Sequence, residues 1–234
     1  MLDIDYIVLT RNSERTLDQC LISIRKYANP RQIIVIDQNS TDHTLDIAKK
    51  HHCLVVRHKG LTIGAARRLG ARVASTPVIA YVDHDVELIS EWHPILEQDA
   101  GLISAHYKGD VPGGTGFGCS ITRRDLILAC DEMDTWGPQE DTVFQSFLKN
   151  HGWRIVNLSV DVVHHNVRSI EKIRWYGAWS RQLRGFQFRV LRQILGGALL
   201  GIRQDKQNDS YIQNWRVRMN YLLGYIFPDL YAAH

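Results

Sequence analysis

Residues 60–85, GLTIGAARRLGARVASTPVIAYVDHD, carry the most informative pattern for the fold. This pattern predicts a helix over 64–74, followed by a short apolar, β-branched strand over 78–82 that ends directly on Asp83. A helix that leads into a buried strand of this kind is the repeating unit of a mostly parallel sheet with helices on both faces. The sequence upstream should therefore repeat the alternation.

Upstream of this stretch, strands and helices do alternate. Apolar strands are predicted at 4–10, 32–37 and 54–57. A first helix follows Asn12-Ser13, with apolar residues at helical spacing: Leu17, Cys20, Leu21, Ile24 and Tyr27. A second helix is predicted to run to about His51, and its N-cap candidates are Ser40, Thr41 and Asp42. We therefore predict an α/β fold.

Polar residues stand at the carboxyl ends of three of these strands, where α/β sheets bind their ligands. They are Thr10, Asp37 and Asp83. Their shared position is a stronger indication of a binding site than any one of them alone.

Downstream of residue 100 the pattern changes. Strands are predicted at 101–107 and 116–122, flanking a glycine-rich loop at 109–118, with further strand pieces at 155–163. A helix is predicted to begin near Glu140 and to stop at Gly152. The residues that this helix should bury are Val143, Phe144, Phe147 and Leu148.

The composition is that of a globular protein, with 44% hydrophobic and 23% charged residues in a chain of 234. The four cysteines include no CxxC pair, which argues against a zinc site or a disulfide scaffold. The N-terminus is acidic and no apolar run reaches about 18 residues, so we expect neither a signal peptide nor a transmembrane helix. A cytoplasmic location is predicted.

Asp83-His84-Asp85 follows a predicted buried strand. Alternation on an extended segment would place both carboxylates on one side. Two hard oxygen donors there suit Mg²⁺ or Mn²⁺, which would bridge to phosphate oxygens. For an isolated triplet of this kind, a solvated turn is the alternative.

Glu140-Asp141 opens a predicted helix. Acids favour the first helical turn because of the helix dipole, and this is the structural interpretation. The functional interpretation makes one of them a general base that takes the proton of an attacking hydroxyl. The nearby Trp136 is either part of an acceptor-facing loop or a buried side chain.

Two further pairs of adjacent residues are candidates for the site: His164-His165 and Arg67-Arg68. One of the two histidines could be a third metal ligand, or both could simply pack. The arginines follow a glycine-flanked loop at a helix start, where a pyrophosphate could bind, although surface arginines usually just solubilise a helix. The glycine spacing matches neither a P-loop nor the dinucleotide-binding fingerprint.

In this order, the segments resemble glycosyltransferase family 2, whose fold is known as GT-A. The resemblance spans residues 4 to 165 and is carried by 8–24, 34–44, 60–85, 116–127 and 140–155. It implies an inverting transfer of a sugar from a nucleotide-diphosphate donor, a UDP- or GDP-sugar, to the hydroxyl of a glycan or lipid-linked acceptor. It also implies Mn²⁺ or Mg²⁺ as the cofactor.

The resemblance implies roles for the matching residues. Thr10, Arg11 and Asp37 would contact the base and ribose of the donor, and Arg67 would lie near the nucleotide. Asp83 and Asp85 would hold the metal, with His164 or His165 as a later ligand. Asp141 would be the catalytic base, with Glu140 and Trp136 at the substrate.

The chain departs from the family at several positions. Gln38 replaces a frequent second acid, Arg68 replaces a frequent Asn, and Phe147 stands where some members have Arg. The segment DEMDTWGPQ replaces the Gly-Gly-Phe-Asp segment that often precedes the acidic pair. The last two departures concern the acceptor more than the reaction.

The resemblance ends before the C-terminal residues. Residues 168–234 hold 11 Lys and Arg against 4 Asp and Glu, a balance of +7, whereas residues 1–167 have a balance of −4. We therefore predict a catalytic domain over 1–167 and a basic, aromatic-rich helical extension over 168–234. The extension would cover the domain's own core, form a homodimer, or contact the cytoplasmic face of an anionic membrane through 168–203. Nucleic-acid binding is the weakest interpretation.

Two rival functions share this pattern. One is a non-catalytic module that binds nucleotide sugars on the same fold, and the intact Asp83, Asp85 and Asp141 argue against it. The other is a sugar nucleotidyltransferase, whose glycine- and arginine-rich N-terminal loop is missing here.

Overall fold

A computed structural model describes residues 3–106, 116–135, 140–159 and 162–165, together with 223 and 226. The chain divides into two units, Met1–His165 and Asn166–His234, and the first holds nearly everything described. Trp136, most of the glycine-rich loop and the segment 168–203 lie outside the described residues. The domain boundary at 167/168 and the membrane and dimer contacts therefore stay predictions.

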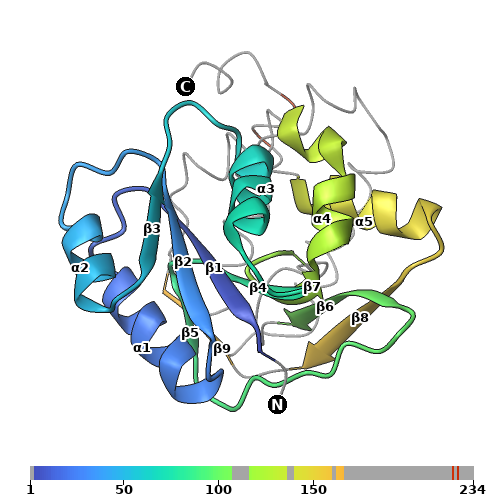
Figure 1. The fold of residues 1–234 in the computed structure, drawn as a ribbon, viewed down its shortest axis with the longest axis horizontal. Helices are drawn as coiled ribbons and strands as arrows, with labels where there is room; N and C mark the ends of the chain where they lie inside the picture. Colours follow the sequence, from blue (N-terminus) through green and yellow to red (C-terminus); the bar gives the residue numbers. More distant parts are fainter. Residues whose placement is uncertain are drawn as a thin grey trace. The chain divides into compact units, whose positions relative to one another are not determined.

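The first half of the chain alternates strands and helices as predicted (Figure 1). Its elements are β1 (Asp5–Thr10), α1 (Leu17–Tyr27), β2 (Gln32–Asp37), α2 (Thr44–Lys50), β3 (Leu54–Arg57), α3 (Ile63–Val73) and β4 (Val78–Val82). Strands β1, β2 and β4 are runs of apolar, mostly β-branched residues that are buried in the sheet, whereas β3 at its edge is only partly buried. The helices present one apolar stripe each.

The second half begins with two short pieces that follow β4. Its elements are β5 (Val86–Leu88), β6 (Ala100–His106), β7 (Cys119–Arg123), α4 (Arg124–Ala129), a 3₁₀ helix η1 (Asp131–Thr135), α5 (Glu140–Asn150), β8 (Arg154–Ser159) and β9 (Val162–His164). Helix α5 begins at the predicted residue. It ends before Gly152, whose φ of +76° is the left-handed conformation that glycine adopts most easily.

Seven strands form one sheet in the order β3-β2-β1-β4-β7-β6-β8. Strands β3, β2, β1 and β4 run parallel, β7 is antiparallel to both of its neighbours, and β6 and β8 are parallel to each other. Strands β5 and β9 pair separately in an antiparallel ribbon. The predicted fold class, a mostly parallel α/β sheet flanked by helices, is confirmed.

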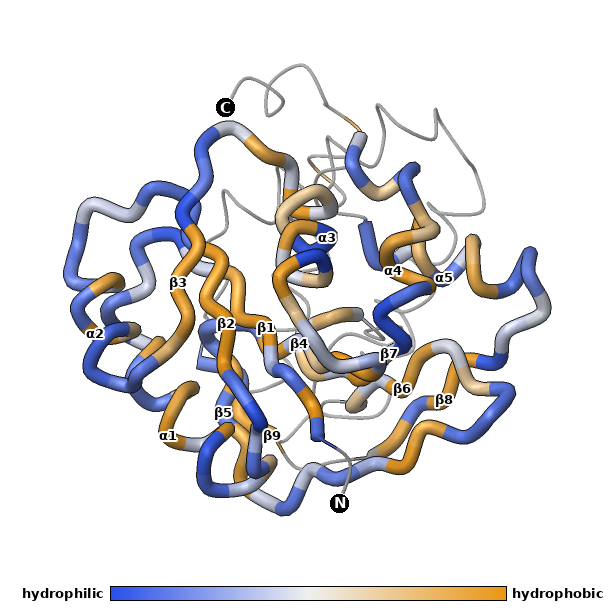
Figure 2. Tube along the Cα trace, in the orientation of Figure 1, coloured by the Kyte–Doolittle hydropathy of each residue, from blue (hydrophilic) through white to orange (hydrophobic). Residues whose placement is uncertain are grey.

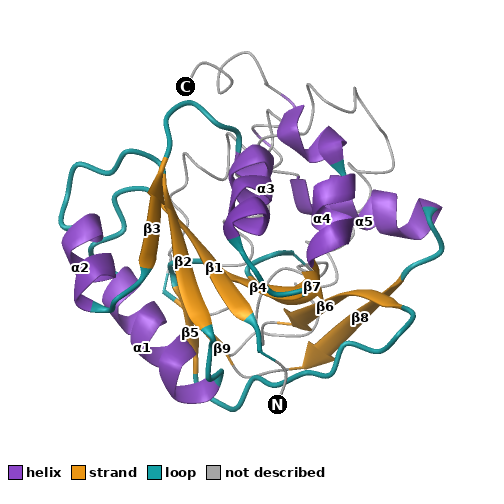
Figure 3. Cartoon of the chain, viewed as in Figure 1, coloured by secondary structure: helices purple, strands orange, loops and turns teal. Residues whose placement is uncertain are grey.

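Alternate residues of the central strands supply two cores, one on each face of the sheet. Tyr6 and Val8 pack into the core that includes α1 and the β5 segment, whereas Ile7 packs into the core that includes α3, α4 and α5. Figure 2 shows the strands as largely hydrophobic and the helices as mixed, and Figure 3 shows the helices around the sheet. The edge at which the strands end is thereby held between two helical layers.

Some local predictions were wrong. The residue at the N-cap of α2 is His43, although the Asp42 carboxylate accepts a hydrogen bond from the Thr44 N–H at 3.0 Å. Strand β7 begins three residues later than predicted, at Cys119. Val143 and Phe147 are partly rather than fully buried. Residues 83–85 form a turn, closed by the Val86 N–H donating to the Asp83 carbonyl at 3.0 Å, rather than an extended segment.

Within the part of the chain that the structure describes, no helix has both the length and the apolar character needed to cross a membrane.

Candidate active site

The candidate site lies at the carboxyl ends of the parallel strands. The register places Thr10 beside Asp37, and Asp37 beside Arg57, so the last residues of β1, β2 and β3 stand in one row. Asp83 follows the neighbouring strand β4. The predicted gathering of polar strand ends is therefore present in the structure.

Thr10 and Asp37 are bonded to each other rather than open to solvent. The Thr10 hydroxyl donates to Asp37 Oδ1 at 3.0 Å, and Ser40 donates its hydroxyl to Oδ1 at 2.5 Å and its N–H to Oδ2 at 3.0 Å. Asp37 is fully buried, whereas Arg11 is exposed. Thr10 and Asp37 thus shape the loops after β1 and β2, and Arg11 stands at the surface beside them.

Asp83 and Asp85 have different neighbours because the chain turns between them. Asp83 is 35% exposed and pairs with Arg67, whose Nη2 lies 3.2 Å from Oδ1. Asp85 is 8% exposed, and its Oδ1 lies 3.5 Å from Nε2 of His164. Burial would raise the pKa of Asp83, but the charge of Arg67 and of nearby histidines holds it below its ordinary value. Asp83 is therefore ionised at neutral pH.

The β5–β9 ribbon separates the two predicted histidines. It pairs Val86 with His164, so that Asp85 and His164 lie together, while His165 Nε2 lies 2.8 Å from Oε2 of Glu87. Glu87 also accepts a hydrogen bond from Gln19 Nε2 at 2.7 Å. His164 is thus the histidine whose side chain lies beside the carboxylate of Asp85. The His165 N–H donates to the Asp85 carbonyl at 2.7 Å, but its side chain contacts Glu87.

Arg67 joins the two acidic parts of the site. Its Nε donates to Glu140 Oε1 at 2.9 Å while its Nη2 reaches Asp83, and its guanidinium lies 4.7 Å above the ring of Phe117. The residue is buried, and its pKa is raised by the charges of Asp83 and Glu140 in spite of burial. Arg67 was predicted to lie near the nucleotide, and the structure places it between these two carboxylates.

Asp141 lies next to that bridge, at the start of α5. Its Oδ1 accepts a hydrogen bond from the Thr142 N–H at 2.7 Å, and its Oδ2 faces Gly116, where an added Cβ would come within 2.9 Å. Burial raises the pKa of Asp141, and the charge of Asp83 raises it further. Burial likewise raises the pKa of Glu140, against the opposing effect of Arg67. A carboxylate with a raised pKa is a stronger base than an exposed one.

The site is rich in negative charge. Asp83 and Glu140 both pair with Arg67, whereas Asp85 pairs with His164. Asp141 adds a fourth carboxylate next to Glu140. In the described ranges, no group of three or more His, Cys, Asp or Glu side chains is arranged to hold a metal ion. Asp85 and His164 nevertheless provide an oxygen and a nitrogen donor side by side, and this donor set suits Mn²⁺ better than Mg²⁺, which prefers oxygen.

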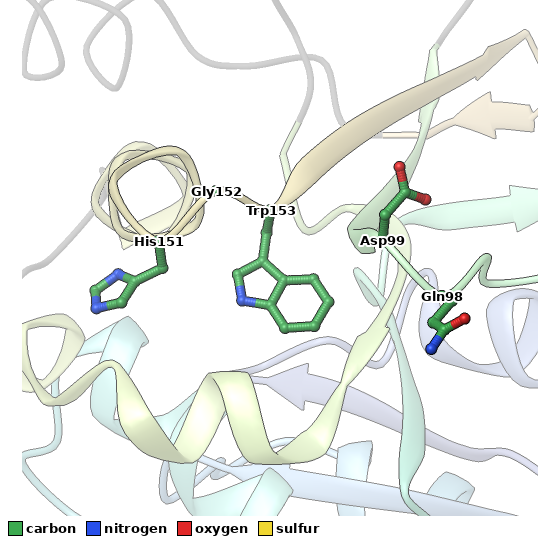
Figure 4. Close-up of a pocket in the computed structure, with 5 residues that line it drawn as sticks. All are labelled: Gln98, Asp99, His151, Gly152 and Trp153. Carbon is green, nitrogen blue, oxygen red and sulfur yellow. The ribbon is translucent and has the colours of Figure 1, made fainter.

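A shallow pocket of about 550 Å³ lies elsewhere on the molecule (Figure 4). It is lined by Gln98, Asp99, His151, Gly152 and Trp153. These residues immediately precede β6 and β8 or end α5, so the pocket lies at the opposite edge of the sheet from Asp83. It is not part of the candidate site.

Three contacts near the site were not predicted from the sequence. His84 Nδ1 lies 3.0 Å from the Thr16 hydroxyl, Glu87 meets His165, and Arg68 pairs with Asp134. The alternation of acids at positions 83, 85 and 87 was visible in the sequence as a signal for the second of these. The first and third have no sequence signal of their own.

Residues 5–101 match the model of the family described as glycosyl transferase family 2. The family resemblance predicted from the sequence is thereby confirmed over that segment. No curated protein matches the chain.

Solved structures with the same fold are distant in sequence. Glucosyl-3-phosphoglycerate synthase from Mycobacterium tuberculosis, solved with Mn²⁺, UDP and glucosyl-3-phosphoglycerate, is 18% identical, with a TM-score of 0.59 over 77% of each chain. The same enzyme with Mg²⁺ and UDP has a TM-score of 0.60 at 18% identity, over 77% of this chain and 76% of that one. A mannosyltransferase from Pyrobaculum calidifontis, solved with GDP-Man and Mn²⁺, is 13% identical, with a TM-score of 0.69 over 99% of this chain and 88% of that one.

Proposed function

Taking the match of residues 5–101 to glycosyl transferase family 2 as the premise, we propose that this chain is a metal-dependent, inverting glycosyltransferase. It would move a sugar from a nucleoside-diphosphate donor to an acceptor hydroxyl. One observation carries the proposal: Arg67 links Asp83, which follows β4, to Glu140, the residue before Asp141. Asp85, two residues after Asp83, pairs with His164. The similar solved structures, with UDP or GDP-Man and a divalent metal, support it.

The nucleotide would lie across the ends of β1 and β2. Thr10 and Asp37 hold the two loops there, and the exposed Arg11 is available to the base or ribose. Asp83 would lie at the diphosphate, held in place by Arg67. Trp136 would face the acceptor, as predicted from its position before Glu140.

Asp85 and His164 would hold a divalent metal, with Asp83 and the donor's phosphate oxygens completing the site. A bound Mn²⁺ or Mg²⁺ offsets the negative charge of the departing diphosphate. Before donor and metal bind, the guanidinium of Arg67 partly offsets the negative charge of Asp83.

Asp141 would act as the general base. Its carboxylate takes the proton of the acceptor hydroxyl while the hydroxyl oxygen attacks the anomeric carbon, and the bond from that carbon to the diphosphate breaks. Because the attack is a direct displacement, the configuration at the anomeric carbon is inverted. Burial of Asp141 suits it to this role because it raises the pKa of the carboxylate.

Release of nucleoside diphosphate tests the proposal. The protein is incubated with a panel of UDP- and GDP-sugars, with Mn²⁺ or Mg²⁺, and the released UDP or GDP is measured. Asp85→Ala should abolish metal-dependent binding of UDP or GDP in calorimetry and leave the fold intact. Unchanged affinity of that variant would remove the metal assignment.

Nucleoside diphosphate release, together with a second assay for pyrophosphate release, separates the rival functions. A module that only binds nucleotide sugars would show Mn²⁺-dependent affinity without release of nucleoside diphosphate. A sugar nucleotidyltransferase would instead release pyrophosphate from a nucleoside triphosphate and a sugar phosphate. Either result would replace the proposed activity.

A further inference from the structure

Arg68 follows Arg67 on α3, but its side chain contacts different residues. It is 7% exposed, and its guanidinium donates from Nη1 to Asp134 Oδ2 and from Nη2 to the Leu128 carbonyl at 2.9 Å. It therefore ties α3 to both α4 and η1, two elements that follow it by about sixty residues in the chain. Figure 1 shows α3 and α4 side by side.

Further contacts of α3 with η1 lie at the start of the helix. The Thr62 hydroxyl donates to the Asp134 carbonyl at 2.8 Å and also caps the helix through the Ala65 N–H at 3.1 Å. Gly64 packs so closely that a Cβ there would lie 1.9 Å from the Met133 carbonyl oxygen. The N-terminal half of α3 is thus the surface on which η1 rests.

The two arginines hold the chain on either side of residues 136–139. Arg68 holds Asp134 before them, and Arg67 holds Glu140 after them. Asp141 is the next residue, so the place of its carboxylate depends on how firmly both ends are held. Neighbouring Arg72, whose Nη2 lies 4.0 Å from Asp134, adds a weaker, more exposed attraction.

Arg68 is the buried member of the pair, whereas the Asp134 side chain is 38% exposed. Each residue also keeps one buried polar atom without a hydrogen-bond partner among the described residues, Nε of Arg68 and Oδ1 of Asp134. The pair fixes geometry because removing Asp134 would leave the buried guanidinium of Arg68 without its carboxylate partner.

We propose that Arg68 and Asp134 are a positioning pair, which holds η1 on α3 and so sets where the carboxylate of Asp141 lies relative to Asp83. The inference rests on the proposed function through the role of Asp141. Neither residue touches substrate, and each acts through the start of α5.

The test is a double-mutant cycle with Arg68→Ala, Asp134→Ala and the double variant, accompanied by the milder Arg68→Lys and Asp134→Asn. Because small misplacement of a catalytic group costs up to about 100-fold in rate, each alanine variant should lower kcat by about 10- to 100-fold. The affinity for UDP or GDP with Mn²⁺, measured by calorimetry, should stay within about twofold, since the donor side of the site is untouched. The double variant should be no slower than the slower single one, because both remove the same contact.

Hydrogen exchange supplies a readout that does not depend on activity. Peptides covering 131–135 and 140–150 should exchange faster in the alanine variants, with those from β1 and β2 unchanged, and Arg68→Lys should restore part of the protection. The matched control is Asp99→Ala, which removes an exposed arginine–aspartate pair with Arg154 at the opposite edge of the sheet. It should leave kcat unchanged.

Three results would overturn the proposal: unchanged kcat in the alanine variants, losses that multiply in the double variant, or donor affinity that falls in parallel with kcat. If an alanine variant does not fold, the lysine and asparagine variants carry the same comparison. A wild-type protein that releases no nucleoside diphosphate would sink the proposed function alone, because hydrogen exchange still decides whether this pair holds the start of α5.

Discussion

At the scale of single residues, the two adjacent acids of α5 have different surroundings. Burial raises the pKa of both carboxylates, but Glu140 is held in an ion pair with Arg67, whereas Asp141 faces Gly116. A carboxylate that is already held by an arginine is less available to accept a proton from a substrate hydroxyl. The environment of these carboxylates therefore favours Asp141 as the base.

Asp141→Asn should keep the affinity for UDP or GDP with Mn²⁺ and lower turnover by about 100-fold or more, the scale of general base catalysis. The measurement is steady-state release of nucleoside diphosphate, with calorimetry for donor binding. Asp99→Asn, the same change at an exposed acid, is the control. Near wild-type turnover of Asp141→Asn would move the base to another residue.

The neighbouring histidines of β9 offer a matched pair of substitutions. His164 lies beside Asp85 and His165 beside Glu87. His164→Ala should weaken Mn²⁺-dependent binding of UDP or GDP by about tenfold or more, and His165→Ala by less, since a residue outside the metal's ligands acts only through orientation. Equal losses in the calorimetric titrations would show that the ribbon as a whole, rather than His164, matters.

At the scale of elements, α3 connects the parts of the site more than any other helix. Its first turn packs on η1, Arg67 on its inner face bridges Asp83 and Glu140, and Gly70 lies against β1. The glycines at these points have no side chain and therefore allow α3 to approach η1 and β1 closely. The glycines of α3 are therefore explained by packing, although glycine weakens a helix by itself.

Gly64→Ala tests that explanation against helix propensity. Propensity alone predicts stabilisation by about 1 kcal/mol, but the new Cβ would meet backbone, 1.9 Å from the Met133 oxygen. We expect a net loss of about 1–3 kcal/mol in the free energy of unfolding, measured by urea denaturation. Gly70→Ala is the matched comparison, because its Cβ meets a side-chain methyl group of Ile7 at 2.6 Å rather than backbone at 1.9 Å and should cost less. Stabilisation by Gly64→Ala would contradict the close packing of α3 on η1.

At the scale of the whole described domain, Asp5 connects the N-terminal ends of strands β1, β2 and β4. Its buried carboxylate accepts hydrogen bonds from the Ser75 N–H at 2.7 Å, the Thr76 N–H at 3.3 Å and Arg31 Nη1 at 3.0 Å. Burial would raise the pKa of Asp5, yet these hydrogen bonds lower it below its ordinary value. The stability of the sheet edge opposite the candidate site therefore depends on the ionised carboxylate of Asp5.

The depressed pKa fixes the direction of the pH dependence. The contribution of Asp5 to stability is fully present above its unfolded-state pKa of about 3.9 and is lost as the pH falls through its folded-state pKa. Asp5→Asn should lower the free energy of unfolding by about 1.5–3 kcal/mol at pH 7, the scale of hydrogen bonds to a charged group. In denaturation at pH 7 and at pH 3, the difference from wild type should shrink at the lower pH. Asp46→Asn, at a largely exposed acid, is the control and should change little.

The last prediction concerns the charge asymmetry of the whole chain. Residues 168–234 carry a balance of +7, and each basic residue near an anionic membrane contributes about 1 kcal/mol. The protein should float with anionic liposomes at low salt and be released at high salt. A protein that stays at the bottom of the gradient at low salt, and unfolds when truncated after residue 167, would show that the extension is structural.

The local hydrophobic pattern of the sequence determined where helices and strands form. Strands β2 and β4 and the start of α5 lie at the residues that the hydrophobic periodicity predicts, because burial on one or two faces dictates which positions are apolar. The positions of Thr10, Asp37 and Asp83 at strand ends follow from the same pattern. The prediction of a ligand site at that edge needed no tertiary contact.

The tertiary structure decided which of these residues meet. His165 contacts Glu87, 78 residues away in the sequence, and Arg68 contacts Asp134, 66 residues away. No periodicity in the sequence predicts contacts between residues so far apart in the chain. The antiparallel β5–β9 ribbon places the side chain of His164, rather than that of His165, beside the carboxylate of Asp85. The packing of α3 turns Arg67 inward to two carboxylates. Local sequence sets which face of an element is apolar, whereas the partner of a charged side chain is set by which elements pack together.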